Sequence, residues 1–196
     1  MPDSKPKQNA IEVRNLDFYY GKFQGLKNVN LDIAEHRVTA FIGPSGCGKS
    51  TLLRHLPGFV TSNSGEIEIL GQKVQSNGKL LPHHKKIRSR VGFVFQQFHL
   101  IAHLSALGNV ETALLYRGLK PAERRDKAMD ALERVGLGSR HDHRPVQLSG
   151  GEQQRVAIAR SLVTDPIIVL ADEPTGALDS SNAENVMQIF ESLRSN

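Results

Sequence analysis

The 196-residue sequence has no tryptophan, one cysteine and only 6% aromatic residues. A single cysteine, Cys47, excludes an internal disulfide and fits a protein of a reducing compartment. No apolar run reaches the roughly 18–20 residues that a transmembrane helix needs, and Met1–Ala10 has no signal-peptide pattern. We therefore expect neither a membrane-spanning protein nor a disulfide-stabilised secreted domain.

What the sequence does contain is typical of a globular protein, with 39% hydrophobic and 23% charged residues. Its net charge of +5 suits a nucleic acid, an acidic membrane surface or a polyphosphate ligand equally well. The densest basic cluster, residues 83–90, has no aromatic residues interleaved with it, so we expect a solvated loop there. Residues 1–9 are polar, and we expect them to be disordered.

One segment matches the phosphate-loop pattern G-x-x-x-x-G-K-[ST] at every fixed position. Its glycines allow the backbone N–H groups to converge on one anion, at the positive end of a following helix. Its lysine would then reach the β- and γ-phosphates of a nucleotide, and its serine hydroxyl would bind Mg²⁺. The segment is Gly43-Pro44-Ser45-Gly46-Cys47-Gly48-Lys49-Ser50, followed by Thr51.

The flanks of this segment have the pattern that a phosphate loop requires. Residues 38–42 predict a short apolar strand before it, and residues 50–56 predict the start of a helix after it. Pro57 should end that helix early. We therefore predict a nucleoside triphosphate site.

The remaining pattern predicts an α/β fold with an N-terminal antiparallel β portion and a helical subdomain at about residues 100–161. Alternating apolar residues indicate strands, Gly21 and Gly25 mark a turn region, and helical periodicity with glycine ends indicates helices. We expect strands at 11–16, 26–33, 66–69 and 91–95, and helices at about 105–118, 121–135, 149–162 and 181–193. Residues 167–171 form a continuous apolar run that predicts a strand buried on both faces.

Two acidic residues follow this last strand, which is where a phosphate loop needs them. Asp172 is placed to hold Mg²⁺, directly or through water. Glu173 is placed to accept a proton from an attacking water.

A second anion cradle is predicted about a hundred residues after the first. In Leu148–Arg155, Ser149 is a good N-cap, and Gly150 and Gly151 expose backbone N–H groups at a helix start. This stretch contains the LSGG[QE] signature, and over nearly its whole length the chain resembles the ATPases of ABC transporters, a family with a P-loop NTPase core. The resemblance implies a head-to-tail dimer in which Ser149, Gly150 and Gly151 of one copy cover the γ-phosphate of ATP bound to the other.

The same resemblance implies three more site residues. Gln96 is similar to the Q-loop glutamine that contacts Mg²⁺ and the attacking water, with the adjacent Gln97 as the alternative. Tyr20 is similar to the aromatic residue that stacks on adenine, with Tyr19 as the alternative. Asp179 is similar to the key residue of the D-loop at the dimer interface.

As a function, the resemblance implies an ATP-binding and hydrolysing subunit that powers an ABC transporter from the cytoplasmic face of the inner membrane. The expected partners are ATP, Mg²⁺, a second copy and transmembrane permease subunits, with no nucleic acid. The alternatives are a non-transport ATPase of this family and a nucleotide-binding regulatory module with impaired hydrolysis. Residues 18–49 resemble phosphate importers, whereas residues 147–179 resemble lipoprotein-release and macrolide-export ATPases, so no transported substrate is predicted.

The resemblance also implies a further strand and a switch histidine after the last predicted helix. None of the eight histidines occupies that position, and the sequence ends at Asn196. We therefore expect residues 10–196 to be a truncated ATPase domain. Because the strand would lie between the one before the phosphate loop and the one before Asp172, its absence should expose strand edges and reduce both stability and hydrolysis.

Overall fold

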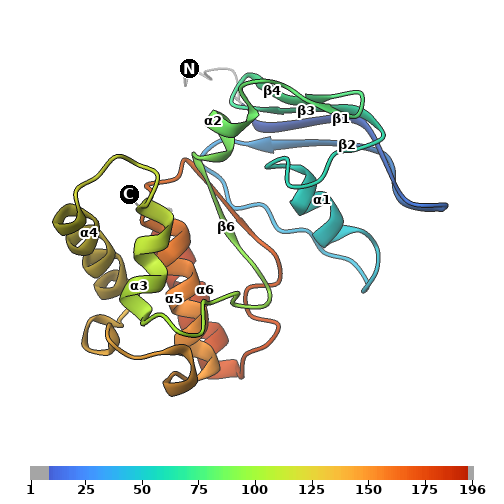
Figure 1. Ribbon diagram of the computed structural model, residues 1–196. Helices are drawn as coiled ribbons and strands as arrows, with labels where there is room; N and C mark the ends of the chain where they lie inside the picture. Colours follow the sequence, from blue (N-terminus) through green and yellow to red (C-terminus); the bar gives the residue numbers. More distant parts are fainter. Residues whose placement is uncertain (1–8, 194–196) are drawn as a thin grey trace, which may run out of the picture. The chain divides into compact units, whose positions relative to one another are not determined.

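A computed structural model describes residues 9–193, which divide into two compact units, one up to Ser89 and one from Arg90. Both contain strands and helices, as the predicted α/β class requires (Figure 1). The predicted disordered segment 1–9 lies outside the described residues except for Asn9, which was predicted wrongly because it begins the first strand. None of the described helices has the length and apolar character needed to cross a membrane.

The first unit is built on an antiparallel sheet with the strand order β2-β1-β3-β4-β5. Two short helices accompany the sheet: α1 contacts β2 and α2 contacts β4. The strands are β1 (Asn9–Tyr20), β2 (Phe23–Ala34), β3 (Ser64–Ile69), β4 (Gln72–Ser76) and β5 (Lys79–Leu80), and the helices are α1 (Lys49–His55) and α2 (His84–Arg88).

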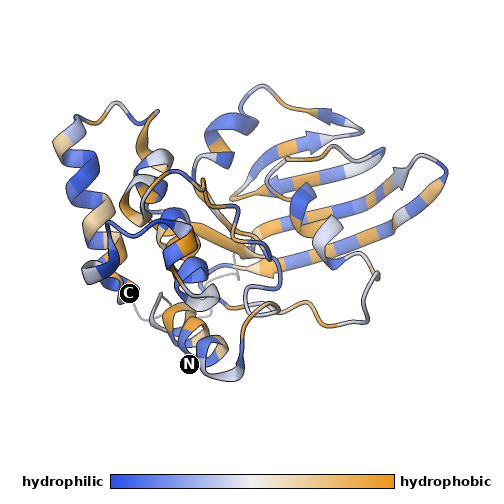
Figure 2. Cartoon of the chain, turned by 60° about the horizontal axis from the view of Figure 1, so that its bottom comes forward, coloured by the Kyte–Doolittle hydropathy of each residue, from blue (hydrophilic) through white to orange (hydrophobic). Residues whose placement is uncertain are grey.

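The long β1–β2 hairpin follows from alternation of apolar and polar residues along both strands (Figure 2). On β1 the side chains of Ile11, Val13 and Leu16 are buried, and the chain reverses at Gly21, whose φ is +59°. Gly25 was predicted to lie in the turn region, but it lies within β2. The hairpin is longer than predicted because the ladder continues through the largely aromatic residues near the turn, where Tyr19 pairs with Gln24 and Tyr20 pairs with Phe23.

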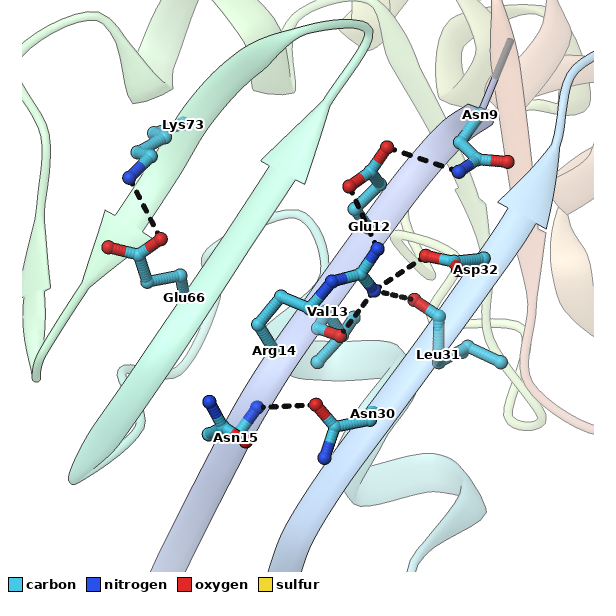
Figure 3. A network of polar contacts seen from close by, with 10 residues as sticks. All are labelled: Asn9, Glu12, Val13, Arg14, Asn15, Asn30, Leu31, Asp32, Glu66 and Lys73. Atoms are coloured by element: carbon cyan, nitrogen blue, oxygen red, sulfur yellow. Dashed lines mark hydrogen bonds and ion pairs between the residues drawn. The ribbon is translucent and has the colours of Figure 1, made fainter. Parts of the chain in front are cut away.

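Polar contacts cross the outer face of this hairpin (Figure 3). The Arg14 guanidinium donates to the carbonyl oxygens of Val13 at 3.0 Å and Leu31 at 3.3 Å, and it pairs with Glu12 and Asp32. The hydrogen bond with Asp32 raises the pKa of Arg14. These contacts fix the β1–β2 register from the solvent side while the apolar side chains fix it from the core.

The second unit combines a parallel two-stranded sheet with a helical cluster. Helices α3, α4 and α5 pack on one another around a common apolar core that includes Val94 and Val186. The elements are β6 (Val91–Val94), β7 (Ile168–Ala171), α3 (Ala106–Glu111), α4 (Pro121–Arg134), α5 (Gly150–Leu162) and α6 (Ser180–Leu193), with 3₁₀ turns at Thr112–Leu114, Gly138–Arg140 and Pro145–Gln147.

Several predictions of local structure are confirmed in these elements. Pro121 lies in the first turn of α4, and Ser149 is the N-cap of α5, as the sequence indicated. Helix α1 ends at His55, two residues before Pro57. These are local signals, and they depend on residues within one turn of the helix end.

Three expectations are wrong. Residues 38–42 form no strand, and Val38 and Ile42 are 70% and 96% exposed. A strand needs a ladder partner, and none of the described strands pairs with this segment. Strand β7 is not buried on both faces: only Leu170 is buried, since among residues 9–193 β7 pairs with β6 alone. Part of the expected loop at residues 83–90 is helix α2.

Gly92 sets how closely β6 approaches the C-terminal end of α5. A Cβ atom at this position would lie 2.8 Å from the Ser161 carbonyl oxygen and 3.1 Å from Pro166 Cγ. Backbone atoms cannot yield as a flexible side chain can, so only glycine fits here.

We predict that Gly92→Ala lowers the free energy of unfolding by about 1–3 kcal/mol. Gly108→Ala is the matched control, because a Cβ there would meet nothing closer than Leu104 Cβ at 3.4 Å. This control should be neutral or stabilising by up to about 1 kcal/mol. Denaturant unfolding followed by circular dichroism measures both, and equal stability of the two variants would contradict the packing argument.

Candidate functional site

The phosphate-loop segment of the first unit is a curved turn that leads into α1. Gly46 and Gly48 have φ values of +80° and +98°, which favour glycine. A Cβ at Gly46 would meet no atom within 4 Å, so the space beside it is open. Gly48 is the N-cap of α1, and its carbonyl accepts the Leu52 N–H at 2.8 Å.

Lys49 lies over the backbone of this turn. Its Nζ donates to the carbonyl oxygens of Gly43 at 2.9 Å and Pro44 at 3.1 Å. Within the described part of the chain it has no carboxylate partner. Among the described residues of the first unit, no acidic side chain therefore neutralises this positive charge, and an anionic ligand would interact favourably with it.

Tyr20 lies at the end of β1, next to the helix that follows the loop. Its hydroxyl is 3.2 Å from Thr51 Oγ1, and its ring packs edge-to-face on Phe18 with centroids 4.7 Å apart. The side chain is nevertheless 54% exposed. Tyr19 is the alternative to Tyr20, and its backbone N–H donates a hydrogen bond to Asn63 Oδ1. Tyr20 is thus held beside the loop with ring surface available for stacking.

In the second unit, two predicted site residues follow β7. Asp172 is buried, and its N–H donates to the Val94 carbonyl at 2.9 Å, continuing the pairing with β6. Glu173 is exposed and has a φ of +46°, a left-handed conformation that costs energy in a residue with a Cβ. The strand end therefore directs two adjacent carboxylates differently, one into the protein and one outward.

Gln96 Nε2 donates to Glu173 Oε2 at 2.9 Å. This bond links the ends of β6 and β7, because each residue lies two positions beyond its strand. The two adjacent glutamines are chemically identical in the sequence, and the residue that makes this hydrogen bond is Gln96, with Gln97 as the alternative. A Cβ at Gly176 would lie 3.5 Å from both Gln96 Nε2 and Glu173 Oε2, so this glycine borders the pair.

The signature segment forms the start of α5. Ser149 Oγ accepts the Glu152 N–H at 3.2 Å, and Glu152 Oε2 accepts the Ser149 N–H at 2.8 Å, a capping box. The bond from the Ser149 backbone lowers the pKa of Glu152. Gly150 and Gly151 occupy the first helical turn, where backbone N–H groups lack partners along the helix.

Asp179 immediately precedes α6 and caps it. Its Oδ1 accepts the Asn182 backbone N–H at 2.9 Å, and its Oδ2 accepts the Asn182 side-chain amide at 2.8 Å. These hydrogen bonds, the backbone one first, lower the pKa of Asp179.

Sequence reasoning missed two residues that hold the segment after Gln96. Arg160 of α5 donates to the carbonyl oxygens of His99 at 2.8 Å and Phe98 at 2.9 Å. Burial lowers the pKa of its guanidinium. Asn109 is fully buried, and its side chain makes four hydrogen bonds to the backbone of residues 101–105. Two features of the sequence could have identified these residues. Arg160 is an arginine within the apolar stretch 156–163, and Asn109 is an asparagine between two core positions of α3.

We predict that Arg160→Lys weakens the attachment of residues 98–99 to α5, because a lysine ammonium lacks the planar fork that reaches two carbonyl groups. Stability should fall by about 1–3 kcal/mol, and amide hydrogen exchange should accelerate at residues 97–100. Arg155→Lys on the same helix is the control, since the described hydrogen bonds to the carbonyl groups of residues 98 and 99 come from Arg160 and not from Arg155. Identical exchange in the two variants would contradict this role of Arg160.

Comparison with known proteins gives a consistent result. Residues 26–176 match the family described as ABC transporter. The chain is 47% identical over 193 residues to a macrolide export ATP-binding/permease protein of Acinetobacter baylyi, covering 95% of the chain but only 29% of that protein. It is 44% identical over 192 residues to a phosphonates import ATP-binding protein of Stutzerimonas stutzeri, covering 92% of the chain and 70% of that protein.

Solved structures resemble the chain as well. A dimeric ATP-binding cassette, MJ0796, in a post-hydrolysis state with ADP and Pi, has 43% sequence identity and a TM-score of 0.83. The match covers 94% of this chain and 82% of that one. The predicted α/β class with a P-loop NTPase core is confirmed by this likeness.

Proposed function

The chain belongs to the ABC transporter family, and on this premise we propose that it binds and hydrolyses ATP to power transport through membrane subunits. The observation that carries the proposal is the Gln96–Glu173 hydrogen bond next to the buried Asp172. The same chain holds a phosphate loop whose Lys49 has no carboxylate partner among the described residues of the first unit. Relatives named for macrolide export and for phosphonate import both match, so the proposal stops at the class of transporter.

In this proposal the first unit binds the nucleotide. The phosphate loop, residues 43–51, would surround the phosphates with its N–H groups and Lys49. Its open space at Gly46 and its positive charge fit that ligand. Tyr20 would stack on the adenine, where an exposed ring face is enough because stacking needs no particular base edge.

The residues present also fit Mg²⁺, which prefers a few oxygen ligands. Ser50, Gln96 and Asp172 would hold it, through a hydroxyl, an amide and a carboxylate oxygen. Because Gln96 uses its amide nitrogen toward Glu173, its Oε1 is left for the metal. When bound, the ion neutralises charge on the phosphates.

Glu173 is proposed as the general base. Its carboxylate would accept a proton from the attacking water, and Gln96, bonded to it, would hold that carboxylate in place. Most of the rate enhancement would come from positioning and charge neutralisation by Lys49 and the loop N–H groups.

The signature segment is proposed to act on a second copy. One chain holds two anion cradles, at residues 43–51 and at Ser149–Gly151, and a head-to-tail dimer gives both of them a phosphate group to bind. A similar cassette solved as a dimer supports this arrangement. We place the protein on the cytoplasmic face of the inner membrane, in complex with permease subunits.

We predict that Glu173→Gln lowers ATP turnover by about 10²–10⁴-fold, because an amide cannot accept the proton. Nucleotide affinity should stay within about threefold, since the phosphate loop is untouched. Steady-state phosphate release and titration with a fluorescent ATP analogue measure the two quantities.

Glu184→Gln, an exposed position on α6, is the control for this variant and should keep full turnover. If Glu173→Gln hydrolyses ATP at the rate of the unmodified chain, Glu173 is not the base.

A further inference from the structure

The two glycines that begin α5 differ in what surrounds them. Neither has a positive φ, so neither is needed for its backbone conformation. Glycine within a helix is less favourable than alanine, because glycine loses more conformational freedom on folding. Each glycine therefore needs another explanation, and the neighbouring atoms give one for Gly151 but none for Gly150.

A Cβ atom on Gly151 would collide with Asn182 of α6. It would lie 2.1 Å from Asn182 Oδ1, 2.3 Å from Cγ and 2.8 Å from Cβ. A Cβ on Gly150 would make only ordinary contacts, at 3.8 Å from Phe98 Cζ and 3.9 Å from Leu178 Cδ2. Packing within the chain thus requires glycine at position 151 and not at position 150.

Asn182 cannot move aside freely. Its backbone N–H and its side-chain amide both donate to the Asp179 carboxylate, at 2.9 and 2.8 Å. The bonds fix the side chain in the position where it fills the space left by Gly151. A larger residue at position 151 would have to displace the Asn182 side chain and break its hydrogen bond to Asp179 Oδ2, since Gly151 itself is buried.

We propose that Asn182 is a positioning residue that holds Asp179 and the start of α6 against the signature end of α5, and that Gly151 is glycine in order to admit it. The effect on turnover that this proposal expects rests on the proposed function, in which both segments cover the nucleotide bound to the second copy. Asn182 makes them one rigid surface, so that Ser149, Gly150 and Asp179 meet the second copy together.

The test is a double-mutant cycle between Gly151→Ala and Asn182→Gly, which removes all three colliding atoms. Gly151→Ala should lower Tm by about 2–8 °C and turnover at least tenfold, while ATP affinity of the isolated chain is unchanged. Adding Asn182→Gly should restore the Tm to that of Asn182→Gly alone and recover most of that variant's turnover. Gly150→Ala is the control for the Tm measurement and not for turnover, and this variant should not lower the Tm.

Additive losses of Tm in the double variant, or an unchanged Tm in Gly151→Ala, would overturn the proposal. Should Gly151→Ala fail to fold, recovery of folded protein in the double variant supports it, and continued failure opposes it. The two hypotheses fail separately. If the unmodified chain has no ATPase activity, the proposed function is wrong, but the non-additive Tm changes of the double-mutant cycle still test the packing of Asn182. If the chain is active and the Tm changes are additive, only the role of Asn182 is excluded.

Discussion

The function that we propose imposes one constraint, because a polyphosphate must be met by fixed positive charge and by N–H groups that have no other partner. The chain provides such groups at the starts of α1 and α5, because a helix leaves its first N–H groups unpaired. Glycines precede or occupy both starts, and Lys49 adds a full charge to the first. At the start of α1 the glycines allow the curved turn that leads into the helix, whereas at the start of α5 Gly151 is buried and leaves the space that Asn182 fills.

The second unit holds its chemical groups through bonds that join separate elements. Gln96 and Glu173 link the ends of β6 and β7. Arg160 ties the following segment to α5 through two hydrogen bonds. Asn182, which is bonded to Asp179 at the start of α6, packs into the space that Gly151 of α5 leaves. Helix α5 is therefore the common support of the Gln96 segment and the D-loop, with the signature at its own N-terminal end.

Much of this arrangement could be predicted from the sequence. The caps of α4 and α5, the end of α1 before Pro57 and the turn glycines are local, and short-range physical chemistry decides them. Residues 38–42 were predicted wrongly because an apolar run shows strand propensity but not its ladder partner. Asn182 and Arg160 could not be assigned, since their roles depend on atoms of another element: Gly151 in one case and the carbonyl groups of residues 98–99 in the other. The left-handed φ of Glu173 likewise has no signal in its residue type.

We propose that the two anion cradles of one chain bind the nucleotides of two different copies. Hydrogen exchange with ATP and Mg²⁺, measured on the Glu173→Gln chain over a range of protein concentrations, tests it most directly. Residues 43–51 should become protected at every concentration, whereas residues 149–153 should become protected only where the chain dimerises. Protection of both segments to the same extent in dilute monomer, or no protection of residues 149–153 in the dimer, would contradict it.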